Sequence, residues 1–211
     1  MPYSAALFDL DGTLQDSEIL WIRATQDFLN DNGVPYDLAA TTALVYGRSS
    51  LDIYNDIAAM PQMAGRTVAD LMVAIRLYFG RLAAADISYP SSVDLLKRMA
   101  LDMPVAIVSG SPKDDVVAAA RDLGVAPSVS LILGAEDVAR GKPDPEGFLK
   151  AAAALGAAPE RCIVFEDSSA GIAAAKAAGM TCVAIARDGR PRQDTSLADI
   201  TVTDLSEFQY P

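Results

Sequence analysis

The stretch Ala5-Ala6-Leu7-Phe8-Asp9-Leu10-Asp11-Gly12-Thr13 shapes the interpretation of the whole chain. An apolar run ends abruptly in two aspartates that are separated by one residue. Such a run predicts a buried strand, and strands of open parallel sheets carry ligand sites at their C-terminal ends. If Asp9 and Asp11 are both extended, their side chains point to the same side. Gly12 then allows an immediate turn that other residues resist.

Two carboxylates held close in one site need a cation, and their hard oxygens suit Mg²⁺. Calcium binding of the EF-hand type would require glycine at the sixth position and glutamate at the twelfth. Counted from Asp9, glycine is fourth and the twelfth residue is Leu20, so this alternative fails. For this stretch alone, a strand followed by a simple Asp-Gly turn remains the other interpretation.

The composition is that of a globular chain with one or two domains. Of its 211 residues, 51% are hydrophobic and 21% are charged, which excludes general disorder. We expect no membrane span, because charges such as Lys176 and Arg187 interrupt the best apolar runs. We also expect no secretory signal, because the N-terminus lacks a basic segment. Cys162 and Cys182 fall in predicted buried strands, which suits core thiols in a reducing cytoplasm.

The net charge of −11 argues against nucleic acid and anionic membranes as partners. An anionic substrate would therefore need a local cationic site. The chain contains no histidine, which excludes Ser-His-Asp triads, His-ligated zinc and histidine general bases. Acid–base chemistry must fall to carboxylates, lysine, tyrosine or metal-bound water. Nothing indicates an obligate protein partner, and a monomer is the default expectation.

The segment after the first strand predicts helices and no strand. Helical spacing of apolar residues occurs at 17–30, 38–46, 50–59 and 68–84, with Ser17 as the expected cap of the first helix. Trp21 and the Tyr78-Phe79 pair are expected in the core of this block. From Pro90 onward, helices at 92–101, 112–123, 145–155 and 168–178 alternate with strands at 105–108, 129–133, 162–165 and 181–186.

This alternation predicts right-handed βαβ units and the α/β fold class, with a doubly wound parallel sheet covered on both faces. The first strand must join this sheet, because it has no other strand to pair with. We therefore expect a core domain of residues 1–14 plus 89–211, and an inserted helical cap domain of residues 15–88.

Polar residues also mark three later segments of the chain, of which the first follows the predicted strand 105–108. After 105–108 comes Ser109-Gly110-Ser111-Pro112, where Ser111 could cap a helix that starts at Pro112. The same geometry would leave the N–H groups of Gly110 and Ser111 free for a phosphate, with the Ser109 hydroxyl beside them.

Lys142 precedes another predicted helix, which Asp144 would cap. A point cation there suits an anionic ligand, although a solvated loop lysine is the alternative. Glu166 and Asp167 end the strand at 162–165, where a helix cap would need only one acid, so the pair favours a metal. These ends converge on one edge of a parallel sheet.

With these four segments the chain resembles the haloacid dehalogenase superfamily, in the branch with a helical cap between the first two motifs. The resemblance covers essentially the whole chain. Asp9-x-Asp11-Gly12-Thr13 matches the first motif, and Ser109, Lys142 and Glu166-Asp167 match the second to fourth. Other phosphate motifs fail. A proline follows Gly141-Lys142, so no Walker loop forms, and the spacing from Cys182 to Arg187 is one residue short of a cysteine phosphatase loop.

The resemblance implies that Asp9 is a nucleophile that forms an aspartyl-phosphate. Asp11 would protonate the leaving alcohol and then activate water. Mg²⁺ would bind the Asp9 side chain, the Asp11 backbone carbonyl and Asp167, with Glu166 in or near its shell. The phosphoryl oxygens would be steadied by Ser109, the N–H groups of Gly110 and Ser111, and Lys142.

The helical segment 15–88 would close over the site and read the leaving group. Arg48, in the loop Tyr46-Gly47-Arg48-Ser49, lies where related enzymes carry a substrate-contacting arginine, and Trp21 and Arg76 are further specificity candidates.

Departures within the family separate its reactions. Dehalogenases lack the second aspartate, and phosphonoacetaldehyde hydrolases need a cap lysine, of which this cap has none. β-Phosphoglucomutase carries a cap lysine and a histidine where Trp21 stands. We therefore expect a Mg²⁺-dependent phosphatase that acts on a small phosphomonoester, such as a sugar or sugar-acid phosphate. A phosphosugar mutase and a catalytically silent binding protein are the alternatives.

Overall fold

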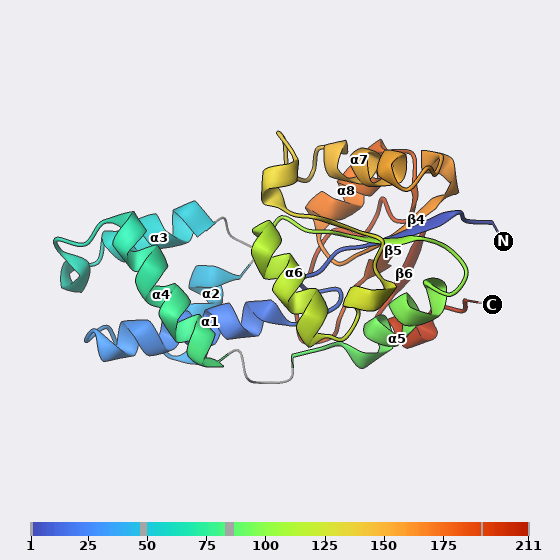
Figure 1. The fold of residues 1–211 in the computed structure, drawn as a ribbon. Helices are drawn as coiled ribbons and strands as arrows, with labels where there is room; N and C mark the ends of the chain where they lie inside the picture. The colour runs from blue at the N-terminus through green and yellow to red at the C-terminus, as the bar shows by residue number, and fades with distance from the viewer. Residues whose placement is uncertain (1, 47–49, 83–86, 191, 211) are drawn as a thin grey trace. The chain divides into compact units, whose positions relative to one another are not determined.

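The chain divides into two compact units. A computed structural model describes residues 2–46, 50–82, 87–190 and 192–210. One unit, here called the sheet unit, comprises Met1–Gln15 and Ser88–Pro211, and the other, the helical unit, comprises Asp16–Ile87. Figure 1 follows the chain through both. The N-terminal strand thus belongs to the same unit as the C-terminal part of the chain.

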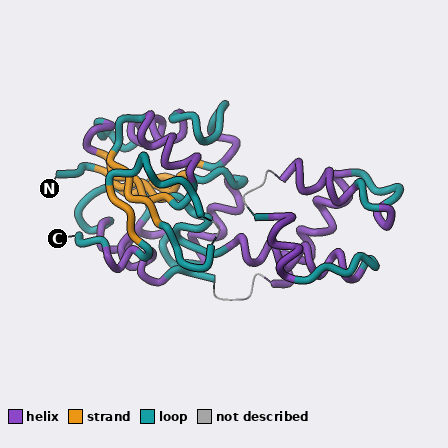
Figure 2. The backbone as a smooth tube through the Cα atoms, turned by 180° about the vertical axis from the view of Figure 1, so that it is seen from behind, coloured by secondary structure: helices purple, strands orange, loops and turns teal. Residues whose placement is uncertain are grey.

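The sheet unit contains a six-stranded parallel sheet with the order β3-β2-β1-β4-β5-β6. Its strands are drawn together in orange in Figure 2. Their bounds are Ala5–Phe8 (β1), Val105–Val108 (β2), Leu131–Leu133 (β3), Cys162–Glu166 (β4), Thr181–Ile185 (β5) and Ile200–Val202 (β6). The chain runs outward from β1 to β3 and then restarts at β4 on the other side of β1. This reversal of strand order next to β1 is where open α/β sheets bind their ligands.

Helices cover both faces of this sheet, and the alternation of side chains along β1 explains why. Ala6 and Phe8 pack in one apolar cluster with α5 (Pro90–Met99) and α6 (Lys113–Asp122). Ala5 and Leu7 pack in a second cluster with α7 (Glu146–Ala154) and α8 (Ser169–Ala177). Figure 1 shows α7 and α8 above the sheet and α5 below it. Because both faces are buried, β1 is apolar without interruption until Asp9.

The helical unit is built from α1 (Ser17–Asp31), α2 (Leu38–Val45), α3 (Ser50–Ala58) and α4 (Val68–Leu82). Its core contains Phe28, which meets the ring of Tyr78 edge-on at 5.8 Å between centroids. Trp21 stacks on Phe79 at 4.1 Å. The cap of α1 is Asp16, whose carboxylate accepts from the Ile19 N–H at 3.3 Å, so the expected cap at Ser17 is wrong by one residue.

The remaining differences from the expected elements are local. The sequence pattern does not predict β6, because two of its three residues are exposed and it contains no apolar run. The predicted strand at 129–133 begins only at Leu131, since a 3-10 turn at Ala126–Ser128 occupies the approach to it. α5 begins at Pro90, where proline suits the first helical position. Other 3-10 turns lie at Pro61–Met63, Ala135–Asp137, Pro159–Arg161 and Leu205–Glu207.

In the part of the chain that the structure describes, no helix has the length and apolar character needed to cross a bilayer. Cys162 and Cys182 are buried in the adjacent strands β4 and β5, and both are free thiols. Burial raises the pKa of both thiols, to about 11 and about 12, so they are core residues and poor nucleophiles.

Candidate active site

The two strands at the centre of the sheet deliver acids to the same edge. Asp9 directly follows β1, and its N–H donates to the carbonyl of Phe165 in β4 at 3.0 Å. Glu166 is the last residue of β4, and its side chain is fully buried. Asp9 is only 6% exposed, whereas Asp11 is partly exposed. The parallel pairing of β1 with β4 therefore places two carboxylates side by side in a region with little water.

Lys142 joins these two buried acids. Its Nζ lies 2.5 Å from Asp9 Oδ1 and 2.5 Å from Glu166 Oε1. The other oxygen of Glu166 accepts from the N–H of Ser168 at 2.8 Å and from its hydroxyl at 2.9 Å. Glu166 is thus held from two directions, and it fixes the ammonium of Lys142 against Asp9. Lys142 is therefore not a solvated loop lysine, since only 17% of its side chain is exposed.

The loop that carries Lys142 is itself fixed by the start of α7. The Glu146 carboxylate accepts from the N–H groups of Ala139 and Arg140 at 3.0 and 3.1 Å. Asp144 Oδ1 accepts from the Glu146 N–H at 3.0 Å, so Asp144 does serve the helix start, although α7 itself begins at Glu146. These bonds tie both sides of the Lys142 segment to the same helix. The lysine is therefore presented from a constrained loop.

The electrostatics of the site show a shortage of positive charge. Burial raises the pKa of Asp9 to about 8, with further upward contributions from Glu166 and Asp11, although the Lys142 ammonium opposes them. Burial alone would lower the pKa of Lys142, but Asp9 and Glu166 outweigh it and hold this pKa above its ordinary value. Lys142 stays charged, yet one ammonium does not balance the carboxylates around it. A divalent cation would supply the missing charge.

The donor atoms for such a cation are present. Carboxylate oxygens of Asp9, Glu166 and Asp167 lie within 4.8 Å of one another. Gly12, with φ of +91°, leaves the room that Asp167 occupies: a Cβ at this position would lie 2.0 Å from Asp167 Oδ2. Three hard oxygen donors in one place fit Mg²⁺. Both oxygens of Glu166 also accept hydrogen bonds, one from Lys142 and one from Ser168.

Asp11 has a separate set of partners. The Ser111 hydroxyl donates to Asp11 Oδ2 at 2.7 Å, and the Ser109 hydroxyl lies 3.3 Å from the same oxygen. Gln15 donates its side-chain amide to Asp11 Oδ1 at 3.1 Å. Both carboxylate oxygens are thus oriented by neutral donors. This environment differs from that of Asp9, which faces an ammonium and two acids.

The expected roles of the Ser109–Ser111 loop are partly wrong. α6 begins at Lys113 after Pro112, and Ser111 does not cap it, because its hydroxyl is bound to Asp11. The Ser111 N–H donates to Ser109 Oγ at 3.0 Å, so it is not free as expected. Ser109 is buried and Gly110 is exposed, with open space beside its Cα. The loop still brings two hydroxyls to the edge where Asp9 and Asp11 lie.

Sequence reasoning missed two partners of Asp11, the Ser111 hydroxyl and the Gln15 amide. Both had a usable signal. Ser111 lies two positions after Ser109, and Gln15 lies four positions after Asp11 in a turn closed by Gly12. In that turn the Gly12 N–H donates to the Gln15 carbonyl at 2.7 Å. The sequence pattern singles out Ser111 only as a helix cap and a backbone donor to phosphate, and it does not single out Gln15.

The specificity candidates lie apart from these residues in the chain. Arg48 falls outside the residues that the structure describes. Trp21 is half-buried and stacks on Phe79, while Arg76 is exposed on α4, where its charge lowers the pKa of Tyr54 against the larger effect of burial. Both belong to the helical unit, whereas the acids belong to the sheet unit. Their part in substrate recognition stays a prediction.

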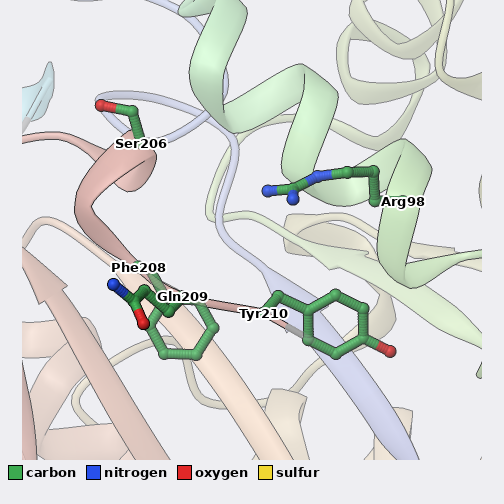
Figure 3. Close-up of a pocket in the computed structure, with 5 residues that line it drawn as sticks. All are labelled: Arg98, Ser206, Phe208, Gln209 and Tyr210. Carbon is green, nitrogen blue, oxygen red and sulfur yellow. The ribbon is translucent and has the colours of Figure 1, made fainter.

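A shallow pocket elsewhere in the sheet unit contains none of these residues. Figure 3 shows Arg98 of α5 opposite the C-terminal segment Ser206, Phe208, Gln209 and Tyr210. Its residues include no acid, and the Tyr210 hydroxyl is engaged by Asp102 at 2.9 Å. Nothing there can act as a nucleophile comparable to Asp9, so the strand ends are the candidate site.

A comparison with protein-family models assigns this arrangement of fold and acids to a class. The model for haloacid dehalogenase-like hydrolases matches residues 3–179, which is most of the chain. The chain therefore belongs to this family of hydrolases. The family assignment agrees with the six-stranded parallel sheet and with the acids that follow β1 and β4.

Similar proteins narrow the class. The chain is 35% identical over 211 residues to validoxylamine A 7'-phosphate phosphatase of Streptomyces hygroscopicus subsp. limoneus, covering 99% of this chain and 97% of that protein. It is 32% identical to fructose-1-phosphate phosphatase YqaB of Escherichia coli, covering 86% and 95%. The crystal structure of CbbY from Rhodobacter sphaeroides in complex with phosphate has a TM-score of 0.80 at 26% identity, covering 97% and 96%. The chain is thus a hydrolase, and its phosphatase relatives support a phosphoric monoester as the bond that it cleaves.

Proposed function

We propose that this protein is a Mg²⁺-dependent phosphatase that hydrolyses a small phosphomonoester, a sugar or sugar-acid phosphate, through an aspartyl-phosphate on Asp9. The observation that carries the proposal is the contact of Lys142 with both Asp9 and Glu166 at the ends of β1 and β4. It supplies a buried nucleophile and a cation for the phosphoryl group at one point. The relatives named as phosphatases support the reaction, and one of them is named for a sugar phosphate.

In the first step, a carboxylate oxygen of Asp9 bonds to phosphorus while the bond from phosphorus to the ester oxygen breaks. Asp11 enters this step protonated and gives its proton to the leaving oxygen. In the second step, the Asp11 carboxylate takes a proton from water as that water attacks phosphorus, and Asp9 leaves with its own oxygens. Ser111 and Gln15 hold Asp11 for both proton transfers.

Lys142 and the Ser109 hydroxyl would contact the phosphoryl oxygens, whose charge spreads during transfer. Glu166 acts through Lys142, since it fixes the ammonium beside Asp9. The carboxylates of Asp9 and Asp167 and the Asp11 carbonyl would hold Mg²⁺, which would supply positive charge for a dianionic ester. Lys142 by itself offsets only one charge of the three acids Asp9, Glu166 and Asp167. The specificity role of Arg48, Trp21 and Arg76 belongs to this proposal.

The activity test is phosphate release from a panel of esters, with Mg²⁺ and with a chelator. The panel contains fructose 1-phosphate, β-glucose 1-phosphate, 6-phosphogluconate and phosphoglycolate. We expect metal-dependent release of phosphate from at least one sugar or sugar-acid ester. Consumption of glucose 1-phosphate without free phosphate would replace the proposal with a mutase. Tight binding of Mg²⁺ without turnover of any ester would favour a silent binding protein.

The metal assignment predicts a specific effect of Gly12→Ala. A methyl group there must displace the Asp167 carboxylate, so we expect Mg²⁺ to bind about ten- to a hundredfold more weakly. Isothermal titration of Mg²⁺ into the variant measures this. The control is Gly33→Ala, since Gly33 has a similar φ of +77° but no heavy atom near the new methyl group. Equal Mg²⁺ affinity of the Gly12 and Gly33 variants would remove Asp167 from the metal site.

A further inference from the structure

Arg187 reaches back from the end of β5 to the turn that follows Asp11. Its Nε donates to the Gly12 carbonyl at 3.1 Å, and its Nη2 donates to the Thr13 carbonyl at 3.2 Å. The Arg187 side chain is only 11% exposed. Two consecutive backbone carbonyls of the turn are thus bound by one planar cation. The fork geometry of a guanidinium fits such a pair, whereas a lysine ammonium would not span it.

The same guanidinium also holds the segment that returns to the sheet unit. Its Nη2 lies 3.1 Å from the Ser92 hydroxyl, and its Cζ lies 3.4 Å from the ring centroid of Tyr89. The Tyr89 N–H donates to the Leu14 carbonyl at 2.9 Å, beside the bridge between Gln15 and Ser88. Arg187 therefore contacts both the segment that leaves the sheet unit and the segment that returns to it. These contacts lie close in sequence to Gln15 and Ser88, where the sheet unit is interrupted.

Asp204 anchors Arg187 from the other side. Its Oδ2 accepts from Arg187 Nη1 at 3.1 Å and from the Ser91 hydroxyl at 2.8 Å. Burial would raise the pKa of Asp204, but hydrogen bonds from Ser206, Ser91 and Arg187 lower it to about 2. The acid is therefore charged at neutral pH, and it binds Nη1, whereas the two turn carbonyls bind Nε and Nη2. Its contacts involve the C-terminal turn and α5, and none of them involves the turn at Gly12.

The turn that Arg187 binds is also the turn that positions Asp11 and Asp167. Gly12 lies against the Asp167 carboxylate so closely that a Cβ would collide with it. The Gly12 N–H closes the turn on the Gln15 carbonyl, and the Gln15 side chain orients Asp11. A shift of the Gly12 carbonyl therefore moves the backbone next to Asp11 and the space available to Asp167.

We propose that Arg187 is a positioning residue for the hydrolytic reaction, acting through the Gly12 and Thr13 carbonyls to set the placement of Asp11 and Asp167. The inference rests on the proposed function for its effect on turnover. Arg187 itself touches neither the acids nor Lys142 in the contacts described above. Its role is distinct from that of Asp204, which holds Arg187 and the C-terminal turn.

The test compares Arg187→Lys with Asp204→Asn as the matched control. In Arg187→Lys the fork is lost, and amide hydrogen exchange at Gly12, Leu14 and Gln15 should be at least about tenfold faster in metal-free protein. The kcat should fall about a hundredfold, the size expected for a small misplacement of reacting groups. We expect KM to change far less than kcat. Asp204→Asn should lower the melting temperature. Its turn exchange rates and its kcat should stay within about threefold of the wild-type values, because Arg187 still binds the Gly12 and Thr13 carbonyls.

The exchange measurement needs neither Mg²⁺ nor substrate, so it decides the positioning role even if no ester is hydrolysed. Exchange of the three turn amides at the wild-type rate in Arg187→Lys would overturn the inference. A fall in kcat that Asp204→Asn shares equally would also overturn it, because general destabilisation would then account for the loss. An inactive wild type with faster turn exchange in the variant would contradict the proposed function alone.

Discussion

Replacing Asp9 with asparagine is expected to lower kcat by at least about a thousandfold while the protein stays folded. An amide oxygen is a poor nucleophile toward phosphorus, and the neighbouring acids Asp11 and Glu166 are held by other partners. Asp11 is bound to Ser111 and Gln15, and Glu166 is bound to Lys142 and Ser168. Phosphate release at saturating ester and Mg²⁺ measures the loss. Retention of more than about a tenth of the wild-type kcat would exclude Asp9 as the nucleophile.

The Asp9→Asn substitution is also expected to change how the stability of the protein depends on pH. Burial raises the pKa of Asp9 from 3.8 to about 8, so the folded, metal-free protein binds an extra proton between these pH values. The free energy of unfolding of the wild type should therefore fall as pH rises through this window. Asp9→Asn has no such proton, and its stability should vary less with pH there. Thermal melts in chelator compare the two proteins at two pH values. The first, pH 5, lies about one unit above the lower end of the window, and the second, pH 9, lies about one unit above its upper end.

Replacing Lys142 with methionine is expected to have the largest effect on stability. It leaves the fully buried Glu166 without its cation, and breaking a buried pair in this way costs about 3–5 kcal/mol. The kcat/KM should fall at least about a hundredfold, because a group that stabilises the phosphoryl charge is lost. Urea denaturation measures the free energy of unfolding, and phosphate release measures the activity.

Two further variants separate the charge of Lys142 from its packing. The double variant Lys142→Met with Glu166→Gln removes the uncompensated charge, so it should be more stable than Lys142→Met alone. Lys113→Met removes an exposed ion pair with Asp137 and should cost less than about 1 kcal/mol. If Lys142→Met costs no more than Lys113→Met, the buried pairing with Glu166 is not a significant source of stability.

The placement of the acids at the ends of β1 and β4 could be predicted because a parallel sheet leaves little freedom there. Once 5–8 and 162–165 are recognised as buried strands, Asp9 and Glu166 must emerge at one edge, and the pairing of Phe8 with Phe165 agrees with this. The apolar periodicity of the helices likewise predicted most of the remaining elements of the fold. Errors at helix ends, such as Asp16 in place of Ser17, arise because neighbouring polar residues can serve as caps equally well.

Contacts between distant segments could not be predicted in the same way. Ser111 fits a cap by its sequence, but the Asp11 carboxylate competes for its hydroxyl and wins. Arg187 lies 175 positions from Gly12, and only the fold brings its guanidinium to that turn. β6 has too little apolar character to be recognised without its neighbour β5. The residues proposed for substrate specificity belong to the helical unit, and a sequence pattern offers no geometry for them.

The most direct test of the account is to trap the phosphoryl group on the protein. Enzyme is mixed with its best ester and Mg²⁺, quenched in acid during turnover, treated with borohydride and only then digested with trypsin, and the peptide of residues 1–23 is examined by mass spectrometry. We predict an aspartyl-phosphate at Asp9, which borohydride converts to homoserine with loss of phosphate, and no such conversion in Asp9→Asn. An unmodified Asp9 peptide during steady turnover, or a phosphoryl group on another residue, would contradict the mechanism.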